Sequence, residues 1–289
     1  MRKFVLFLIA VAGLGLPGTS SVPAKSPDSD KLAAVVQKAL DYCRRLDKTA
    51  LDFICTEYVE EEANRASRPS ATAVTLDIRG GTYIKPPPPD SFKTTTYLYD
   101  YQFIRKGKDV KERRDLMEKD GEKVPATDAA TETKHFKFRD ILFGPSLLLG
   151  EGTALKYEYS LAGEGKIKGD PTVVVACAAQ PAFAGKTLTG RASVRVKDGA
   201  ILKIDWDAES FSGYDEVLSV AERLHMAPKI QSSTEFGIEK NGVRFPSLDV
   251  TEEAYTSGSK SKFIRSTVTV KYKDYKFFTV ETNIDLKRP

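Results

Sequence analysis

Hydrophobic side chains near the N-terminus recur every three or four residues, which is the spacing of one face of an α-helix. Charged residues lie opposite this stripe, and Ser29 or Asp30 precedes it as a helix cap. The members of the stripe are Leu32, Val35, Val36, Ala39, Leu40, Cys43 and Leu46. The pattern predicts one long amphipathic helix whose apolar stripe covers another apolar surface.

Beyond Lys48 the hydrophobic period changes to two, which is typical of β-strands with one buried face. Short turns such as Asp198-Gly199 and Asn241-Gly242 separate the alternating segments and indicate antiparallel neighbours. Further turns are predicted at Asp120-Gly121 and Lys273-Asp274. The predicted strands are 51–59, 95–104, 110–117, 155–161, 172–178, 187–197, 201–206, 230–240, 243–254, 263–272 and 277–284.

Three segments depart from this alternation. The four prolines Pro86 to Pro89 have no N–H to donate to a sheet, so we expect a loop or spacer there. Apolar residues after His135 predict a short helix up to Phe143, followed by a loop. The segment Asp215 to Leu224 returns to helical spacing and predicts a second inserted helix.

Together these elements predict an α+β fold that is mainly antiparallel β. The expected architecture is a curved, open half-barrel of about ten strands, covered by the long N-terminal helix and the short inserted helices. No change in composition divides the chain, so we expect residues 25–289 to form a single domain.

The first residues match a secretory signal peptide. Arg2 and Lys3 precede the apolar run from Phe4 to Leu16, and Val22-Pro23-Ala24 supplies small residues for cleavage. The apolar run is too short to span a bilayer. We therefore expect residues 1–24 to be removed near Ala24, leaving a periplasmic or secreted protein without a stable membrane anchor.

Export makes disulfide bonds possible. Cys43 and Cys55 lie twelve positions apart, whereas Cys177 belongs to an apolar strand. The spacing favours a bond between Cys43 and Cys55, with Cys177 as a buried free thiol. The alternative is that Cys43 and Cys55 are also free and buried.

The composition excludes several classes of function. The 289 residues include 44 Lys and Arg against 40 Asp and Glu, a formal net charge of +4, which gives no basic surface for nucleic acid. His135 and His225 have no partner at metal-ligand spacing, so neither a metal nor a cofactor is expected. No Gly-x-Ser-x-Gly or His-Glu-x-x-His motif is present, so we predict no catalytic residue and no enzyme.

The segment from Gly190 to Trp206 reads Gly-Arg-Ala-Ser-Val-Arg-Val-Lys-Asp-Gly-Ala-Ile-Leu-Lys-Ile-Asp-Trp. It resembles the G-x-x-x-V-x-x-x-x-G-x-I-L-K-I strand-turn-strand pattern of the LolA/LolB-like lipoprotein-carrier superfamily, which includes outer-membrane lipoprotein-sorting proteins. The order of leader, helix, antiparallel strands and late helices is similar too. The resemblance implies an incomplete barrel whose concave face holds acyl chains, with a lipid or lipidated protein as partner. No individual acyl-binding residue of the family matches a position in this chain.

Aromatic side chains that share one face of a strand are the predicted ligand-binding residues. They are Tyr97, Tyr99, Tyr101 and Phe103 on one strand, Tyr157 and Tyr159 on another, and Trp206 at the end of a third. A concave face lined in this way would solvate an acyl chain, with about 0.8 kcal/mol for each buried methylene. The alternatives are that these residues pack under the leading helix as a closed core, or face solvent at a rim.

Three functions follow from these patterns. The first is an exported carrier-like protein that holds acyl chains on its concave face by hydrophobic sequestration, without covalent chemistry. The alternative is a cell-envelope interaction or scaffold protein with a closed core and no ligand. An enzyme is the third, and no nucleophile–base pair or metal-ligand cluster supports it.

Overall fold

The computed structural model describes residues 27–49, 52–64, 74–76, 82–84, 92–106, 109–124, 144–257 and 261–278. The expected signal peptide, the four-proline loop and the predicted helix up to Phe143 lie outside the described residues. The last part of the predicted strand 277–284 lies outside them as well.

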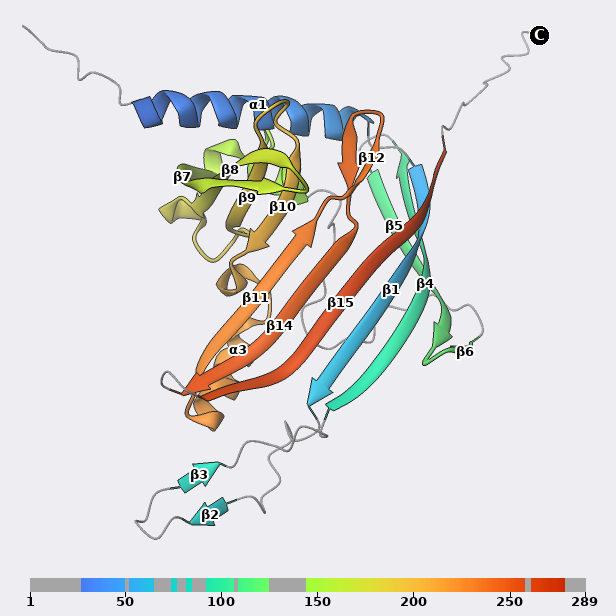
Figure 1. Ribbon diagram of the computed structural model, residues 1–289, viewed down its shortest axis with the longest axis vertical. Coiled ribbons are helices and arrows are strands. Elements are labelled where there is room, and N and C mark those ends of the chain that lie inside the picture. Colours follow the sequence, from blue (N-terminus) through green and yellow to red (C-terminus); the bar gives the residue numbers. More distant parts are fainter. Residues whose placement is uncertain are drawn as a thin grey trace, which may run out of the picture.

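The predicted N-terminal helix is confirmed and spans Pro27–Thr49 (α1). Asp28 and Asp30 lie in its first turn and Lys48 in its last, so the charges complement the helix dipole. Its apolar stripe is fully buried along the second half of the helix, at Ala39, Tyr42, Cys43 and Leu46. The helix therefore crosses one end of the molecule with its apolar face turned inward (Figure 1).

One antiparallel sheet of eleven strands makes up most of the fold, in the order β6-β5-β4-β1-β15-β14-β11-β10-β9-β8-β7. The end strands β6 and β7 do not pair with each other, so the sheet is open. Its strands are β1 (Asp52–Asn64), β4 (Phe92–Lys106), β5 (Asp109–Lys119), β6 (Glu122–Lys123), β7 (Tyr157–Ile167), β8 (Asp170–Ala179), β9 (Gly190–Arg195), β10 (Ile201–Trp206), β11 (Ala227–Glu235), β14 (Leu248–Ser257) and β15 (Ser261–Phe278). The predicted open, mainly antiparallel α+β fold is confirmed.

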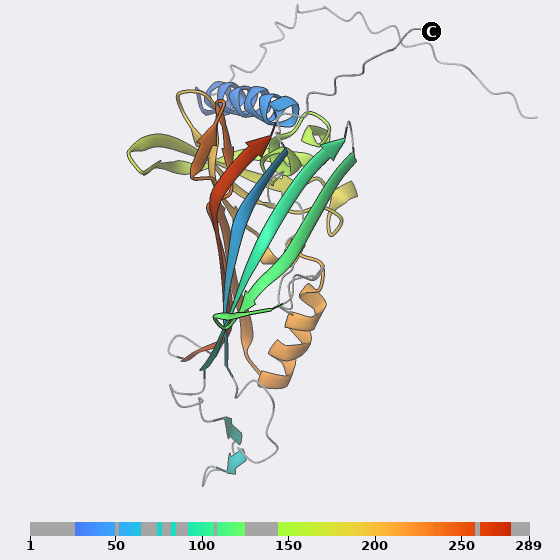
Figure 2. The same ribbon diagram turned by 90° about the vertical axis from the view of Figure 1, so that its right-hand side faces the viewer.

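Two short helices pack on the same face of this sheet, which we call the inner face. Helix α2 (Gly144–Leu149) contacts β9 and β10, and helix α3 (Tyr214–Leu224) contacts β11. Figure 2 shows α3 beside the lower end of the long strands, while α1 lies across the opposite end. The prediction of a helix at 215–224 is confirmed, since α3 differs from it by one residue.

Two small sheets complete the described structure. They are the pair β2 (Val74–Leu76) and β3 (Thr82–Ile84), and the hairpin β12 (Ile238–Lys240) and β13 (Val243–Phe245). The β12–β13 hairpin turns at Asn241-Gly242 with φ values of 52° and 74°, as the Asn-Gly pair predicts. The long strands predicted at 230–240 and 243–254 are wrong, because each of them breaks where this hairpin leaves the main sheet.

The turn predicted at Lys273-Asp274 is also wrong. Strand β15 runs through it without interruption, and the register with β1 shifts opposite the step from Ile54 to Thr56. Asp274 has a φ of 54°, so one residue in the left-handed region absorbs the extra position as a β-bulge. A polar pair therefore bends a long strand here and does not end it.

The loop expected after Phe143 is a helix instead. Pro145 lies in the first turn of α2, where a missing N–H costs no helical hydrogen bond and the fixed φ suits the helix. Gly144 lies against Trp206, and a Cβ at that glycine would be 3.1 Å from the indole Cζ2. The Gly-Pro pair thus begins a helix that packs directly on the inner face.

Candidate functional site

The inner face is a continuous array of side chains, because residues directly opposite each other in an antiparallel sheet point to the same side. One row runs in register from β4 across the sheet to β7, and we call it the middle row. Its members are Tyr97, Val59, Val270, Asp249, Thr234, Ile204, Ala192, Val175 and Leu161. Seven of these nine side chains are hydrophobic, and all of them except the partly exposed Leu161 are buried.

The four predicted aromatic residues of β4 all lie on the inner face and are buried. Tyr99 is 1% exposed and Phe103 is fully buried, while Tyr97 and Tyr101 are 5% exposed. Phe103 stacks on Phe53 with the ring centroids 5.2 Å apart. This half of the inner face is therefore aromatic, as the alternation along β4 predicts.

The other three predicted residues lie on the same face but toward the opposite edge of the sheet. Tyr157 shares a hydrogen bond of 2.8 Å with the hydroxyl of Thr187, and Tyr159 donates to the carbonyl of Leu148 at 2.9 Å. Trp206 packs beneath α2 and is 6% exposed. The structure thus places all seven residues on one face, although β4 and β7 are separated by the strands between them.

In the described conformation these seven residues belong to the hydrophobic core. Tyr159 is partly exposed, and the other six are at most 6% exposed. Atoms of the protein itself cover them, so a ligand could reach them only after some covering element moves.

Sequence reasoning did not single out the charged groups on this face. Glu57 is 2% exposed and accepts a hydrogen bond from Nε of Arg114 at 2.7 Å. Arg114 also donates to Glu112 at 3.3 Å and lies 4.5 Å above the ring of Tyr101. The signal was present in the alternation of β1, where Glu57 occupies an inward position between Cys55 and Val59.

Asp249 is the second charged group that sequence reasoning missed. It is 1% exposed and lies directly opposite Thr234, whose hydroxyl donates to Oδ2 of Asp249 at 2.5 Å. Nε1 of Trp206 donates to the same Thr234 hydroxyl at 2.9 Å. Burial raises the pKa of the Asp249 carboxyl to about 7, and the negative charge of Glu57 adds to the shift.

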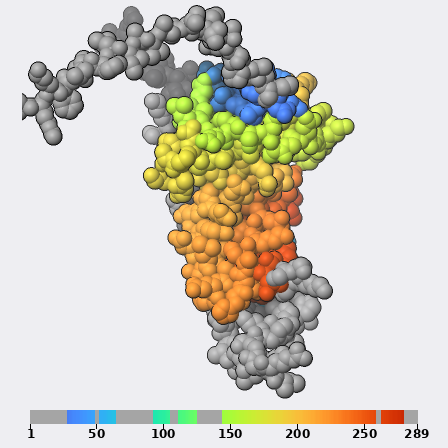
Figure 3. All heavy atoms as spheres, turned by 90° about the vertical axis from the view of Figure 1, so that its left-hand side faces the viewer, coloured from blue at the N-terminus to red at the C-terminus, as the bar shows by residue number. Residues whose placement is uncertain are grey.

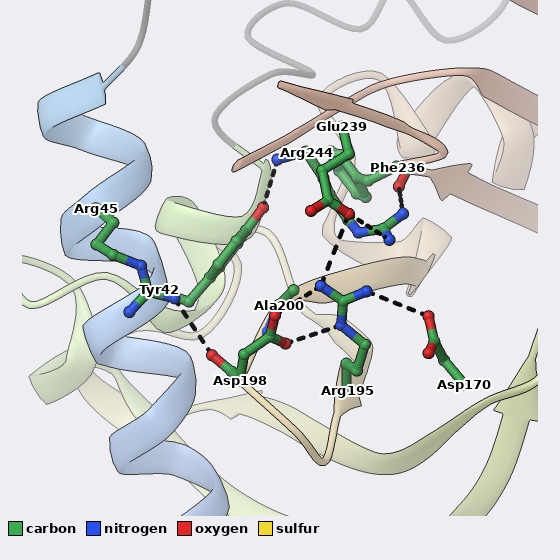
Figure 4. Close-up of polar contacts among 9 residues, drawn as sticks. All are labelled: Tyr42, Arg45, Asp170, Arg195, Asp198, Ala200, Phe236, Glu239 and Arg244. Carbon is green, nitrogen blue, oxygen red and sulfur yellow. Dashed lines mark hydrogen bonds and ion pairs between the residues drawn. The ribbon is translucent and has the colours of Figure 1, made fainter. Parts of the chain in front are cut away.

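Helix α1 is attached to the sheet through polar contacts around its apolar stripe. The hydroxyl of Tyr42 accepts a hydrogen bond from the backbone N–H of Arg244 at 3.0 Å, and Arg45 donates to the carbonyl of Asp198 at 3.3 Å. Figure 4 shows how Arg195 extends this network, with ion pairs to Asp198 at 2.6 Å and to Asp170 at 3.2 Å. The helix is thus tied to the β12–β13 hairpin and to the turn between β9 and β10, and Arg195 links that turn to Asp170 at the start of β8.

The turn between β9 and β10 packs directly against the backbone of α1. Gly199 has a φ of 77°, and a Cβ there would overlap the backbone of Lys38 and lie 2.9 Å from N of Ala39. Only glycine fits both the left-handed backbone and this close approach. Figure 3 shows α1 and the adjoining β7–β8 region forming one continuous surface at this end of the molecule.

The expected disulfide is absent, and this corrects the prediction of a bond between Cys43 and Cys55. All three cysteines are free and buried, as expected for Cys177. Cys43 on α1 lies beside Ser146, whereas Cys55 on β1 lies beside Tyr275. The fold therefore turns the two predicted partners toward different neighbours.

The described residues contain no group of three or more His, Cys, Asp or Glu side chains that could hold a metal ion. His135 lies outside these residues, and His225 ends α3 as an exposed residue with a φ of 50°. Within the same ranges, no helix has both the length and the apolar character needed to cross a membrane.

Comparison with known proteins finds similarity in solved structures only, since no protein-family model and no curated protein matches the chain. An outer membrane lipoprotein-sorting protein domain from Vibrio parahaemolyticus is 10% identical with a TM-score of 0.43, over 85% of this chain and 94% of that one. A LolA superfamily protein from Nitrosomonas europaea is 9% identical with a TM-score of 0.34, over 86% and 94%.

A third similar structure is the MucA/MucB complex of Pseudomonas aeruginosa, where the match is 12% identical with a TM-score of 0.23, over 83% of this chain and 99% of that one. The matches thus include members of the superfamily that the sequence resembles. Because all identities are near a tenth and the TM-scores are below 0.5, the function proposed below rests on the geometry of this chain alone.

Proposed function

We propose that this chain is an exported, carrier-like binding protein that holds the acyl chain of a lipid or lipidated protein on the inner face of its sheet. The observation that carries the proposal is the middle row, which is hydrophobic at seven of nine positions on a sheet whose edges do not close. Binding is by burial of apolar surface and uses no covalent chemistry.

The described conformation is the closed one in this proposal, with the inner face covered by the protein itself. Helix α1 is the cover that moves, because the side chains of its first half, 28–38, are at most partly buried and its ion pairs lie near the surface. The ion pairs Arg44–Glu151 and Lys31–Glu164 have side chains that are 39–68% exposed, and such pairs each contribute about 1 kcal/mol or less. The buried stripe of α1 supplies most of the remaining attachment.

Lipid extraction of the mature protein from its native envelope tests the proposal directly. We expect an acyl lipid to co-purify, and a fluorescent fatty-acid probe to bind the delipidated protein. The absence of both contradicts the proposed function.

The variant Gly199→Ala tests whether α1 is the element that moves to expose the inner face. The added methyl group overlaps the backbone of α1, so we expect faster binding of the fatty-acid probe together with a lower melting temperature. Gly121→Ala is the matched control, because its φ of 80° imposes the same backbone strain while a Cβ there meets nothing within 4 Å. Equal probe-binding rates in the two variants exclude α1 as the cover.

A second candidate is an interaction protein with a closed core and no ligand. It is favoured by the burial of the predicted aromatic residues, six of which are at most 6% exposed. Under this alternative, neither the wild-type protein nor Gly199→Ala binds the fatty-acid probe, and the extract contains no lipid.

A further inference from the structure

Asp249 is a carboxylic acid in the middle row, whose other members, except Thr234, are hydrophobic and would contact an apolar ligand. Asp249 and Thr234 are the polar members of the middle row, and they stand next to each other at its centre, with Val270 on one side and Ile204 on the other. An ionised carboxylate here lies in an apolar surface, where the loss of hydration strongly disfavours charge. A structural role alone would be served by a neutral residue of similar size.

A chain of two hydrogen bonds joins this carboxyl to Trp206, which packs beneath α2. The indole N–H of Trp206 donates to Oγ1 of Thr234, and the hydroxyl of Thr234 donates to Oδ2 of Asp249. The far side of the indole lies against Gly144, the first residue of α2. Asp249 is therefore linked through two side chains to helix α2, which packs on the inner face.

The charged and titratable groups around Asp249 do not neutralise it. On β1 the facing group is Glu57, whose charge opposes ionisation of Asp249, and on β15 it is the phenol of Tyr272. The nearby cation of β5, Arg114, is already bonded to Glu57 and Glu112. Strands β10 and β11 contribute Trp206 and Thr234, so among the described residues no cation pairs with Asp249.

We propose that Asp249 makes ligand binding depend on pH, because the inner face accepts an apolar chain when this carboxyl is protonated and rejects it when the carboxyl is ionised. This inference rests on the proposed function and adds its regulation. Burial sets the pKa of Asp249 to about 7, so both forms are populated near neutral pH. A bound acyl chain offers this carboxyl neither a cation nor a hydrogen-bond donor, so it favours the protonated form. Binding therefore takes up a proton and strengthens as the pH falls.

The first test needs no ligand. Trp206 is the only tryptophan of the chain, so the tryptophan fluorescence comes from a member of this hydrogen-bond chain. We expect its emission to titrate with a midpoint near pH 7 in the wild-type protein and to stay constant between pH 5.5 and 8.5 in Asp249→Asn. An unchanged titration in the variant assigns the signal to another group, such as one of the two histidines, and overturns the inference.

The second test measures the affinity of the fluorescent fatty-acid probe at the same pH values, with that probe's own ionisation measured separately. We expect wild-type affinity to fall about thirtyfold from pH 6 to pH 8.5, because the protonated fraction of a group with a pKa of about 7 falls by that factor. We expect Asp249→Asn to bind at every pH as tightly as the wild type does at pH 6. Glu57→Gln is the comparison variant, and it should keep a pH dependence. A pH-independent wild type refutes this inference but leaves the proposed function, whereas absence of binding at every pH refutes the proposed function.

Should Asp249→Asn fail to fold, calorimetry on the wild type decides the matter. Titration of the probe at pH 7 in two buffers of different ionisation enthalpy gives the number of protons taken up. Net uptake supports the inference, and a value of zero overturns it.

Discussion

At the scale of single residues, alternation predicts which charged side chains point to the inner face but does not predict which residues they pair with. The period of β1 correctly places Glu57 inward, between Cys55 and Val59. The cation that meets it, Arg114, is 57 positions away in the chain, and the pairing of β1, β4 and β5 brings the two together. The local alternation of a strand decides which face a side chain points to. The residue that it pairs with depends on which strands lie side by side in the sheet.

Replacing Arg114 by Met removes the cation and leaves Glu57 buried without its ion pair. We expect the free energy of unfolding to fall by about 3 kcal/mol, as measured by urea denaturation, because an uncompensated buried charge is strongly destabilising. The double variant Glu57→Gln/Arg114→Met should recover a large part of this loss. Lys111→Met is the control on the exposed side of the same strand, and it should change stability little. A variant Arg114→Met as stable as the wild type would show that the pair is not needed.

At the scale of elements, helix α1 illustrates what periodicity can and cannot predict. The apolar stripe correctly indicates the helix and the face that is buried. Its position across the end of the sheet depends on contacts with distant turns, such as the hydrogen bond between Tyr42 and Arg244, 202 positions apart. The breaks of β11 and β14 have the same cause, because leaving the sheet to form the β12–β13 hairpin depends on contacts that lie outside the local pattern.

The variant Tyr42→Phe tests the attachment of α1 at this point. It keeps the ring but leaves the backbone N–H of Arg244 without its acceptor, so we expect a loss of about 1 kcal/mol and a melting temperature lowered by a few degrees. Tyr58→Phe is the control, since the Tyr58 hydroxyl bonds to the side chains of Glu60, at 3.4 Å, and Thr96, so its removal takes no acceptor from a backbone N–H. Equal melting temperatures in the two variants would show that the Tyr42 hydrogen bond contributes nothing to the attachment.

At the scale of the whole molecule, the order of strands in the sheet differs from their order in the chain. Strand β15, the last described strand, pairs with β1, the first. The pairing of β15 with β1 joins the strands β6, β5, β4 and β1 to the strands from β14 to β7, and so makes the middle row continuous across the sheet. It also separates Cys43 from Cys55, since Cys43 lies on α1, which packs on α2, whereas Cys55 lies on β1 between β4 and β15.

The three cysteines provide a check on this arrangement. We expect three reactive thiols in the protein unfolded without reductant, and very slow labelling of the native protein at pH 8. Burial raises the pKa of the Cys177 thiol to about 12 and moves the Cys43 and Cys55 thiols in the same direction, so little of the reactive thiolate is present. A single reactive thiol after unfolding would instead support a bond between Cys43 and Cys55.

The sequence by itself determined the type of each long element, the side of each strand that is buried and the open antiparallel class of the sheet. These properties follow from hydrophobic period and turn chemistry, which are local. Only the tertiary structure decided that Asp249 stands beside Thr234 in an apolar row, that Gly199 meets the backbone of α1, and that the aromatic face is covered. Each of these depends on strand order and register across the sheet, which bring together side chains that no short stretch of sequence connects.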